Sequence, residues 1–167
     1  MTSEPQAPDD HRSGGHRVAE RSEPRERAHA RSVPLAVLSA IAVGGALGAV
    51  ARYSVSVALP HGPGDFPFST FLIDVSGCLL IGALVVVLTE VMGRPHQLAR
   101  PFFGVGLLGG YTTFSAYTAE ALVLLDTSTS TALAYLFGTL LAAVLAVQIG
   151  VVTTRAVVAQ VRKEPGS

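Results

Sequence analysis

Four ionisable side chains lie inside or close to long apolar segments of this sequence: Arg52, Asp74, Glu90 and Glu120. A charge at the centre of a bilayer costs about 2.5 kcal/mol or more, so such residues usually face a bundle interior or an aqueous path. Arg52 and Glu90 are close to segment ends, from which long side chains reach the membrane surface. Asp74 and Glu120 sit deeper. For these two, the residue types alone leave both a functional role and a structural hydrogen bond open.

A second chemical feature is the stretch Gly-Leu-Leu-Gly-Gly-Tyr-Thr-Thr-Phe-Ser at residues 106–115. Each glycine costs about 1 kcal/mol in a helix interior, and threonine hydroxyls can bond their own backbone instead of continuing a helix. We therefore expect a helix break near the middle of the membrane. The freed carbonyl groups need partners, and a hard cation is a natural one. Alternatively, the glycines only permit close packing, because Gly106 with Gly110 and Gly44 with Gly48 have Gly-x-x-x-Gly spacing.

The elements that must position these residues are four predicted membrane-spanning helices. A bilayer core of about 30 Å needs roughly 20 apolar residues in a helix. The four segments run from about Pro34 to Leu59, Pro67 to Met92, Pro101 to Leu125 and Thr131 to Thr154. They are apolar on all sides, whereas a soluble bundle helix has a polar stripe. The predicted fold class is therefore an all-α membrane protein with four transmembrane helices.

Charge is distributed unevenly along the 167 residues. Residues 1–32 hold six arginines and six acidic residues, half of the charged residues in the whole chain. We predict a disordered polar tail over residues 1–32, a transmembrane domain over 33–158 and a polar C-terminal tail over 159–167. The net charge is zero, although the chain consists of a polar tail and an apolar body. Because there is no excess of positive charge, we expect no nucleic-acid partner. No nucleophile–base pair, phosphate loop or metal-ligand cluster in the sequence points to an enzyme.

Lysine and arginine in the connections predict the orientation in the membrane. Beyond the tail, the basic residues on its side of the predicted helices are Arg94, Arg100, Arg155, Arg162 and Lys163. The opposite side has at most Arg52, near the end of the first helix. We expect a multi-pass protein of the cell membrane with both termini in the cytoplasm.

Three blocks of the sequence resemble, in order, the motifs of the Fluc (CrcB) fluoride channels of bacteria. GGALGAVARY at 44–53 is similar to the first-helix block of that family, and STFLIDVSGCLLIG at 69–82 to its second-helix block. GLLGGYTTFSAYTAE at 106–120 is similar to the third block, which is highly specific. The resemblance spans roughly residues 34–157.

The resemblance implies a fluoride-specific channel subunit that exports toxic fluoride by passive conduction. It also implies an antiparallel dimer with two narrow pores, a third helix that is broken at the Gly-Gly-x-Thr-Thr segment, and a lipid bilayer around it. A structural sodium ion, which is not transported, would lie at the dimer centre. The backbone carbonyls of Gly109 and Thr112 match the positions that bind it.

The same resemblance assigns pore positions. A pair of pore phenylalanines corresponds to Phe114 and Tyr117, and an aromatic ring edge is the positive part of its quadrupole, so it attracts an anion weakly. The hydrogen-bond donors of the pore correspond to Thr70, Tyr135 and Thr139. The remaining motif positions, taken as structural, are Arg52, Gly110, Thr113, Ser115 and Glu120.

Three positions depart from the family pattern. Asp74 stands where the family has an asparagine that donates a hydrogen bond to fluoride. An ionised aspartate has no donor and would repel an anion, so either Asp74 is kept protonated by burial or its pore does not conduct. Tyr117 replaces a phenylalanine and adds a hydroxyl group at the pore wall. Ala143 stands where the family often has a serine, which removes one donor.

Two alternatives to a conducting homodimer remain open. A dimer of identical, oppositely inserted chains needs little lysine and arginine bias, whereas the bias here is strong. The chain could therefore pair with an oppositely oriented paralogue, and Asp74 favours a non-conducting structural partner subunit. A proton-coupled small multidrug antiporter has a similar size but needs an acidic residue in its first helix, where this chain has only Arg52.

Overall fold

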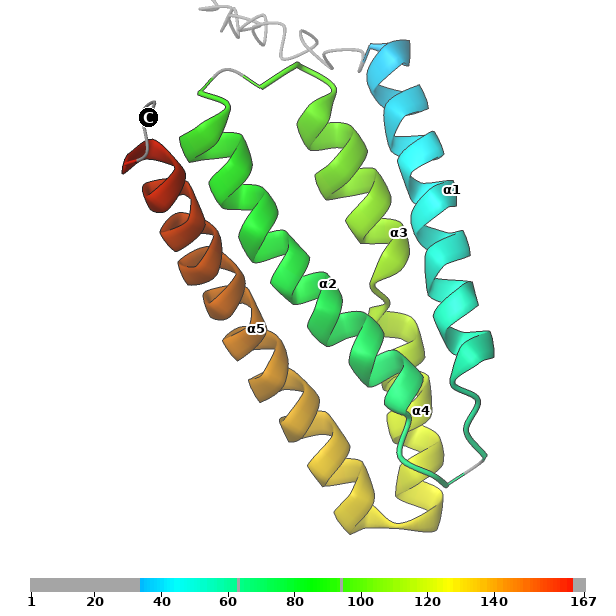
Figure 1. The fold of residues 1–167 in the computed structure, drawn as a ribbon. Helices are drawn as coiled ribbons and strands as arrows, with labels where there is room; N and C mark the ends of the chain where they lie inside the picture. The colour runs from blue at the N-terminus through cyan, green and yellow to red at the C-terminus, as the bar shows by residue number, and fades with distance from the viewer. Residues whose placement is uncertain (1–33, 63, 94, 164–167) are drawn as a thin grey trace, which may run out of the picture. The chain divides into compact units, whose positions relative to one another are not determined.

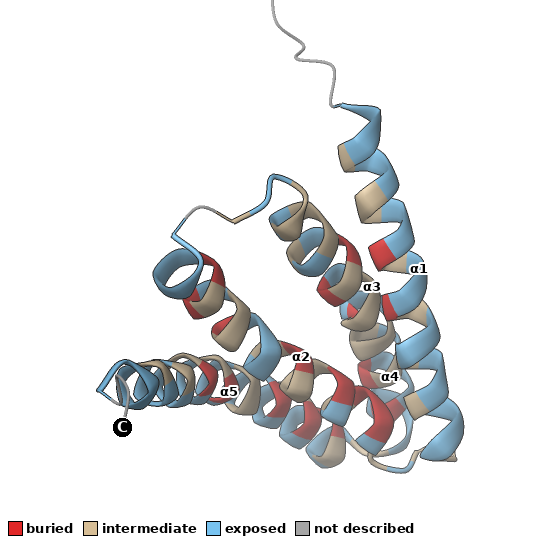
Figure 2. Ribbon diagram, turned by 45° about the horizontal axis from the view of Figure 1, so that its top comes forward, coloured by how far each residue is buried: buried red, intermediate tan, exposed pale blue. Residues whose placement is uncertain are grey.

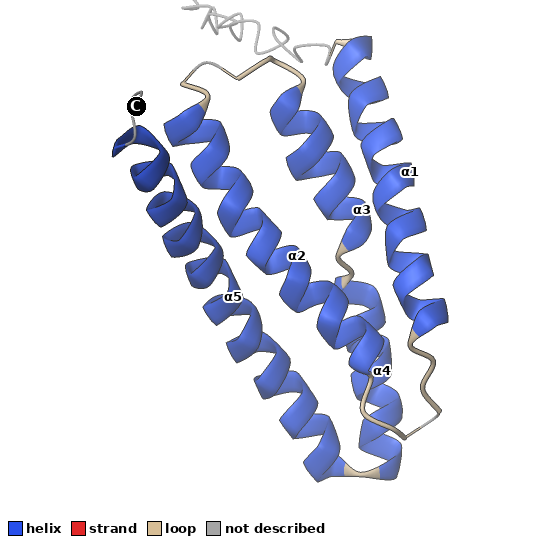
Figure 3. Cartoon of the chain, viewed as in Figure 1, coloured by secondary structure: helices blue, strands red, loops and turns tan. Residues whose placement is uncertain are grey.

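The computed structural model describes residues 34–62, 64–93 and 95–163. The predicted N-terminal tail, residues 1–32, lies outside the described residues. Within the described ranges every regular element is a helix (Figure 3). The elements are α1 (Leu35–Ala58), α2 (Phe68–Val86), η1 (Val87–Val91), η2 (Arg100–Leu108), α3 (Gly109–Tyr111), α4 (Phe114–Thr127) and α5 (Thr129–Lys163). The two η elements are π-helical.

Three of the predicted spans are continuous helices that are long and apolar enough to cross a membrane (Figure 1). They are Leu35–Ala58, Phe68–Val91 and Thr129–Lys163. The third predicted span, from about Pro101 to Leu125, is instead divided among η2, α3 and α4. The described residues therefore form an all-helical protein with the segments of a multi-pass membrane protein.

Helix α5 is longer than the sequence predicted. The fourth span was expected to end at Thr154, but the helix continues to Lys163 and includes residues 159–163 of the predicted polar tail. Neither glycine nor proline follows Gly150 within α5, so nothing in this stretch breaks the helix. Arg162 and Lys163 occupy its last turn, where positive charge interacts favourably with the helix dipole.

Helix α1 is in backbone contact with η2 and α3 through two Gly-x-x-x-Gly pairs, Gly44 with Gly48 and Gly106 with Gly110. A Cβ atom added at Gly48 would overlap the carbonyl oxygen of Leu107, and one at Gly110 would overlap the carbonyl oxygen of Gly45. Only glycine permits an approach this close. The packing interpretation of these glycines is therefore confirmed.

Helices α2 and α5 are likewise in close backbone contact at glycines. A Cβ atom at Gly82 would overlap the carbonyl oxygen of Val147, and one at Gly150 would overlap that of Leu79. The buried residues lie on the faces that the helices turn toward one another, and the outer faces are exposed (Figure 2). Large apolar side chains cover these outer faces, as lipid contact requires.

Side-chain contacts show which helix ends lie together. The Arg155 guanidinium pairs with the Glu90 carboxylate at 2.7 Å, and Arg162 donates to the Glu90 carbonyl oxygen at 2.7 Å. At the other end, Gly64 of the α1–α2 loop lies against Thr127 at the end of α4. Glu90, which was expected to reach the membrane surface, is exposed and has a partner on α5 that the sequence did not indicate.

Candidate functional site

Between α3 and α4 the backbone is extended at two threonines. Thr112 has φ −77° and ψ 158°, and Thr113 has φ −152° and ψ 107°. The Thr112 hydroxyl donates to the carbonyl oxygen of Leu108 at 3.0 Å. The Thr113 hydroxyl caps α4 by accepting from the N–H of Ala116 at 3.2 Å. Both hydroxyl groups thus bond to nearby backbone, which stabilises a non-helical conformation.

This geometry leaves two carbonyl groups without their helical partners. In a continuous helix the Thr113 N–H would donate to the Gly109 oxygen, but it donates to Asp74 Oδ1 at 3.0 Å. The Ala116 N–H would donate to the Thr112 oxygen, but it donates to the Thr113 hydroxyl. Among the described residues, the carbonyls of Gly109 and Thr112 have therefore lost the N–H donors that a continuous helix would give them.

One of the two carbonyls that lie between them in the sequence, that of Gly110, has a side-chain partner. Arg52 Nε donates to the Gly110 oxygen at 3.2 Å, so the first-helix arginine satisfies one of the acceptors at the end of α3. The Ser115 hydroxyl lies 3.2 Å from that of Thr113. Arg52, Gly110, Thr113 and Ser115 thus make contacts that shape the extended segment.

A cavity of about 270 Å³ adjoins this segment, and we call it the break cavity. Four of the predicted pore residues line it: Asp74, Phe114, Tyr117 and Thr139. Ala143 also lines it, one helical turn beyond Thr139. Most of the predicted pore positions therefore meet at one place.

The Thr139 side chain is the unusual group in the break cavity. Thr139 is only 4% exposed, and its hydroxyl oxygen has no hydrogen-bond partner among the described residues. Leaving a buried hydroxyl unpaired costs about 1–3 kcal/mol. One residue of the cavity wall thus carries a hydroxyl group whose hydrogen-bonding capacity is unused among the described residues.

The aromatic side chains form a line that leads away from the break cavity. The ring centroids of Phe114 and Tyr117 are 6.0 Å apart, and those of Tyr117 and Tyr135 are 5.2 Å apart. The Tyr117 hydroxyl, expected at the pore wall, donates to the carbonyl oxygen of Leu136 at 2.7 Å. That bond holds the Tyr117 ring against α5 and uses the hydroxyl proton.

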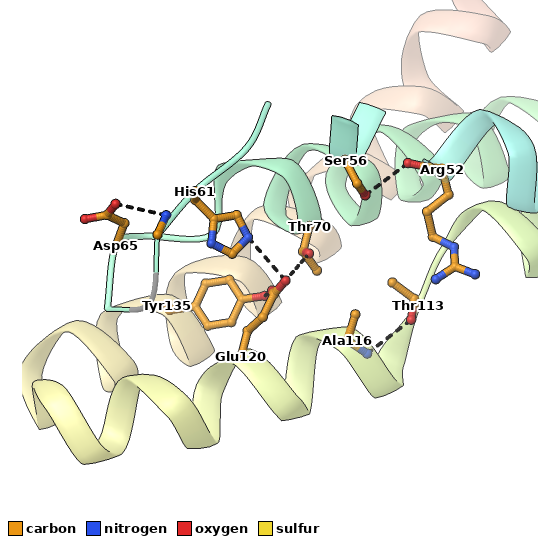
Figure 4. Close-up of polar contacts among 10 residues, drawn as sticks. Arg52, Ser56, His61, Asp65, Thr70, Thr113, Ala116, Glu120 and Tyr135 are labelled. Atoms are coloured by element: carbon orange, nitrogen blue, oxygen red, sulfur yellow. Dashed lines mark hydrogen bonds and ion pairs between the residues drawn. The ribbon is translucent and has the colours of Figure 1, made fainter. Parts of the chain in front are cut away.

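The line ends at the carboxylate of Glu120 (Figure 4). The Thr70 hydroxyl donates to Glu120 Oε1 at 2.8 Å, and the Tyr135 hydroxyl donates to Oε2 at 2.9 Å. Tyr135 is fully buried and Thr70 is 4% exposed. Three predicted site residues from α2, α4 and α5 are thus joined by hydrogen bonds.

A histidine that the sequence did not single out completes this group. His61 Nε2 lies 3.5 Å from Glu120 Oε1 (Figure 4). Next to the pair is a cavity of about 310 Å³ between the α1–α2 loop and α4, which we call the loop cavity. The contact joins residues 59 positions apart by way of a loop, so no local sequence pattern indicated it.

No cluster of three or more histidine, cysteine, aspartate or glutamate side chains that could hold a metal ion occurs in the described part of the chain. Gly109, one of the two predicted sodium ligands, is exposed, and an added Cβ atom there would meet nothing within 4 Å.

Comparison with known proteins gives a consistent result. Residues 39–151 match the family model described as CrcB-like protein, Camphor Resistance (CrcB). The chain is 50% identical over 126 residues to the fluoride-specific ion channel FluC 2 of Nocardia farcinica, covering 74% of this chain and 89% of that relative. It is 50% identical over 113 residues to the fluoride-specific ion channel FluC 1 of Streptomyces coelicolor, covering 66% and 72%. The fluoride-specific ion channel FluC of Paracoccus denitrificans is 36% identical over 116 residues, covering 69% and 91%.

Proposed function

Because the chain belongs to the CrcB family of fluoride-specific ion channels, which are not enzymes, we propose that it is a channel subunit through which fluoride leaves the cytoplasm by passive conduction. The carrying observation is the unpartnered hydroxyl of Thr139 in the wall of the break cavity. A small anion that sheds its water needs such donors. Phe114 and Tyr117 line the same cavity, and their ring edges would add weak attraction.

The fluoride path is proposed to follow the residues that link the two cavities. From Thr139 and Phe114 it would pass the Tyr117 ring and reach Tyr135 and Thr70, whose hydroxyls donate to Glu120 in this structure and would have to turn from it to donate to the anion. Phe114, Tyr117 and Glu120 are three residues apart in turn on α4, which places them near one another on the helix. The contacts already described between these side chains support a continuous path.

A structural sodium ion is proposed at the carbonyl oxygens of Gly109 and Thr112. Both oxygens lack their helical N–H partners among the described residues, whereas the Gly110 oxygen is satisfied by Arg52. One sodium ion would be bound by these oxygens from both subunits, at the interface between them. It would stabilise the extended segment and would not be transported.

An antiparallel dimer is proposed as the active form. Phe114 is 78% exposed although it borders the break cavity, and its neighbour Ser115 is also exposed. The exposed Ser115 hydroxyl is poorly suited to lipid, and the space beside Gly109 is unfilled. A second subunit would therefore cover the face that carries Gly109, Phe114 and Ser115. The second subunit would be another copy of this chain or an oppositely oriented paralogue. The basic residues at one end favour the paralogue, with both termini in the cytoplasm.

A second candidate function is a structural subunit whose own pore is silent. Asp74 lines the break cavity and accepts a hydrogen bond through Oδ1, as a carboxylate does. Negative charge there would oppose fluoride entry. The chain would then fold with and orient an active paralogue.

Fluoride efflux from liposomes tests these proposals. The chain would be reconstituted alone, then with its paralogue, each with and without Asp74→Asn. Efflux from the chain alone supports a conducting homodimer. Efflux only after the paralogue is added supports a heterodimer. No fluoride-selective efflux from any of the four preparations would overturn the channel proposal.

A further inference from the structure

The loop cavity places a titratable base at one end of the proposed fluoride path. His61 and Glu120 lie on its wall, with side chains 26% and 23% exposed. Glu120 is in turn bonded to Thr70 and Tyr135, both buried. The cavity therefore connects solvent-accessible side chains with the buried donors of the proposed path.

The charges around this cavity are mainly negative. Glu120 faces it from α4 and accepts hydrogen bonds at both carboxyl oxygens. Asp65 faces it from the α1–α2 loop, and its Oδ2 accepts from the Gly62 N–H at 3.1 Å. From α2 and α5, the neutral hydroxyls of Thr70 and Tyr135 contact Glu120 without lining the cavity. Among the described lining residues, His61 is the one basic side chain.

An anion that approaches two carboxylates is repelled unless a nearby positive charge offsets them. Histidine is the side chain that gains or loses charge near neutral pH. We propose that the loop cavity is the access site for fluoride at this end of the pore, and that protonation of His61 controls its occupancy by the anion. Protonated His61 neutralises the carboxylate of Glu120 and raises the local fluoride concentration. Neutral His61 leaves both carboxylates uncompensated.

This inference rests on the proposed conduction of fluoride and adds a control residue to it. The test is fluoride efflux from liposomes at about pH 6 and about pH 8, on either side of the histidine range. Protein-free liposomes correct for leakage of hydrogen fluoride. Asp74→Asn would be the background, because it removes the other acid on the path. The variants are His61→Gln, which stays neutral, and His61→Arg, which stays charged.

The expected result is a flux about threefold to tenfold higher at the lower pH in the background protein. His61→Gln should give the low flux at both pH values, and His61→Arg the high flux at both. His96 is the matched control, because it lies in the η1–η2 loop, where its Nδ1 accepts from Leu98 N. His96→Gln should keep the pH dependence. A full pH dependence in His61→Gln, or a measurable but pH-independent flux in the background protein, would overturn the inference.

A binding measurement distinguishes failure of the access-site inference from failure of the conduction proposal. In detergent-solubilised protein, the imidazole ring signals of His61 in an NMR titration should shift to a higher midpoint in fluoride than in gluconate. His96 should not respond. If efflux is absent but the His61 response occurs, the access site stands and the conduction proposal fails. Equal midpoints in the two salts would overturn the access site whatever the efflux shows.

Discussion

The hydroxyl of Tyr117 donates to the main-chain carbonyl oxygen of Leu136 at 2.7 Å and so links α4 to α5. This bond sets the plane of an aromatic ring that borders the break cavity. It also explains how a tyrosine is accommodated where the family pattern has a phenylalanine. The polar end of the ring points to backbone, and the ring itself stays at the cavity.

Replacement of Tyr117 by phenylalanine should change stability more than conduction. Loss of the bond to Leu136 should lower the free energy of unfolding by about 0.5–1 kcal/mol. Fluoride flux should stay within about twofold of the wild type, since the ring edge remains. Unfolding in detergent with a denaturant and liposome efflux measure the two effects. Tyr117→Leu is the control that removes the ring, and undiminished flux in it would contradict a role for the aromatic edge.

Asp74→Asn should raise fluoride flux at neutral pH. The asparagine oxygen can still accept from the Thr113 N–H, and its amide adds a donor that an ionised aspartate lacks. Asp74→Ala is the comparison, because it leaves the Thr113 N–H without an acceptor and should cost about 1–3 kcal/mol of stability. Efflux and unfolding are measured on both. Equal flux in wild type and Asp74→Asn would show that the aspartate does not hinder the anion.

Thr139→Val should separate stability from conduction. Valine has nearly the same shape but no hydroxyl, so it removes a buried polar group that has no partner. We expect the free energy of unfolding to stay the same or to rise by up to about 1–3 kcal/mol. We expect the fluoride flux to fall. Thr139→Ser keeps the hydroxyl and should retain the flux. A Thr139→Val protein with wild-type flux would remove the observation on which the proposed pore rests.

Gly48→Ala should destabilise the protein. Its Cβ atom would overlap the Leu107 carbonyl oxygen, and forcing apart a close-packed contact costs about 1–3 kcal/mol. Gly138→Ala is the matched control in a helix, because its Cβ atom would meet nothing within 4 Å. That variant should be neutral or stabilised by up to about 1 kcal/mol. Denaturant unfolding compares them, and equal stability of the two variants would refute the close approach of α1 and η2.

Removal of sodium should destabilise the proposed dimer. At the proposed site, exchange of sodium for a bulky organic cation would leave the carbonyl oxygens of Gly109 and Thr112 without a bound ion. We expect a lower melting temperature in detergent and a shift toward monomer, because an ion that binds only the folded dimer stabilises it. Melting curves and light scattering at matched ionic strength report both. Identical curves in the two salts would argue against the sodium site.

The sequence by itself determined the features that depend on local composition. Long apolar segments predicted the helices, because backbone polar groups in a bilayer must bond within their own segment. The Gly-x-x-x-Gly spacing indicated close helix packing, since a backbone without Cβ atoms allows it, but it did not name the helices that meet. The block at residues 106–120 identified the family. Each of these signals lies within one short stretch of chain.

Only the tertiary structure decided which polar groups meet. Thr70, Glu120 and Tyr135 come from three helices, and His61 joins them from a loop. The bond of Asp74 to the Thr113 N–H is likewise a contact between distant segments. Such contacts depend on the rotation and depth at which helices pack, and several arrangements satisfy the same apolar pattern. The sequence could therefore name most of the polar residues of the site, but packing chose the partner of each one.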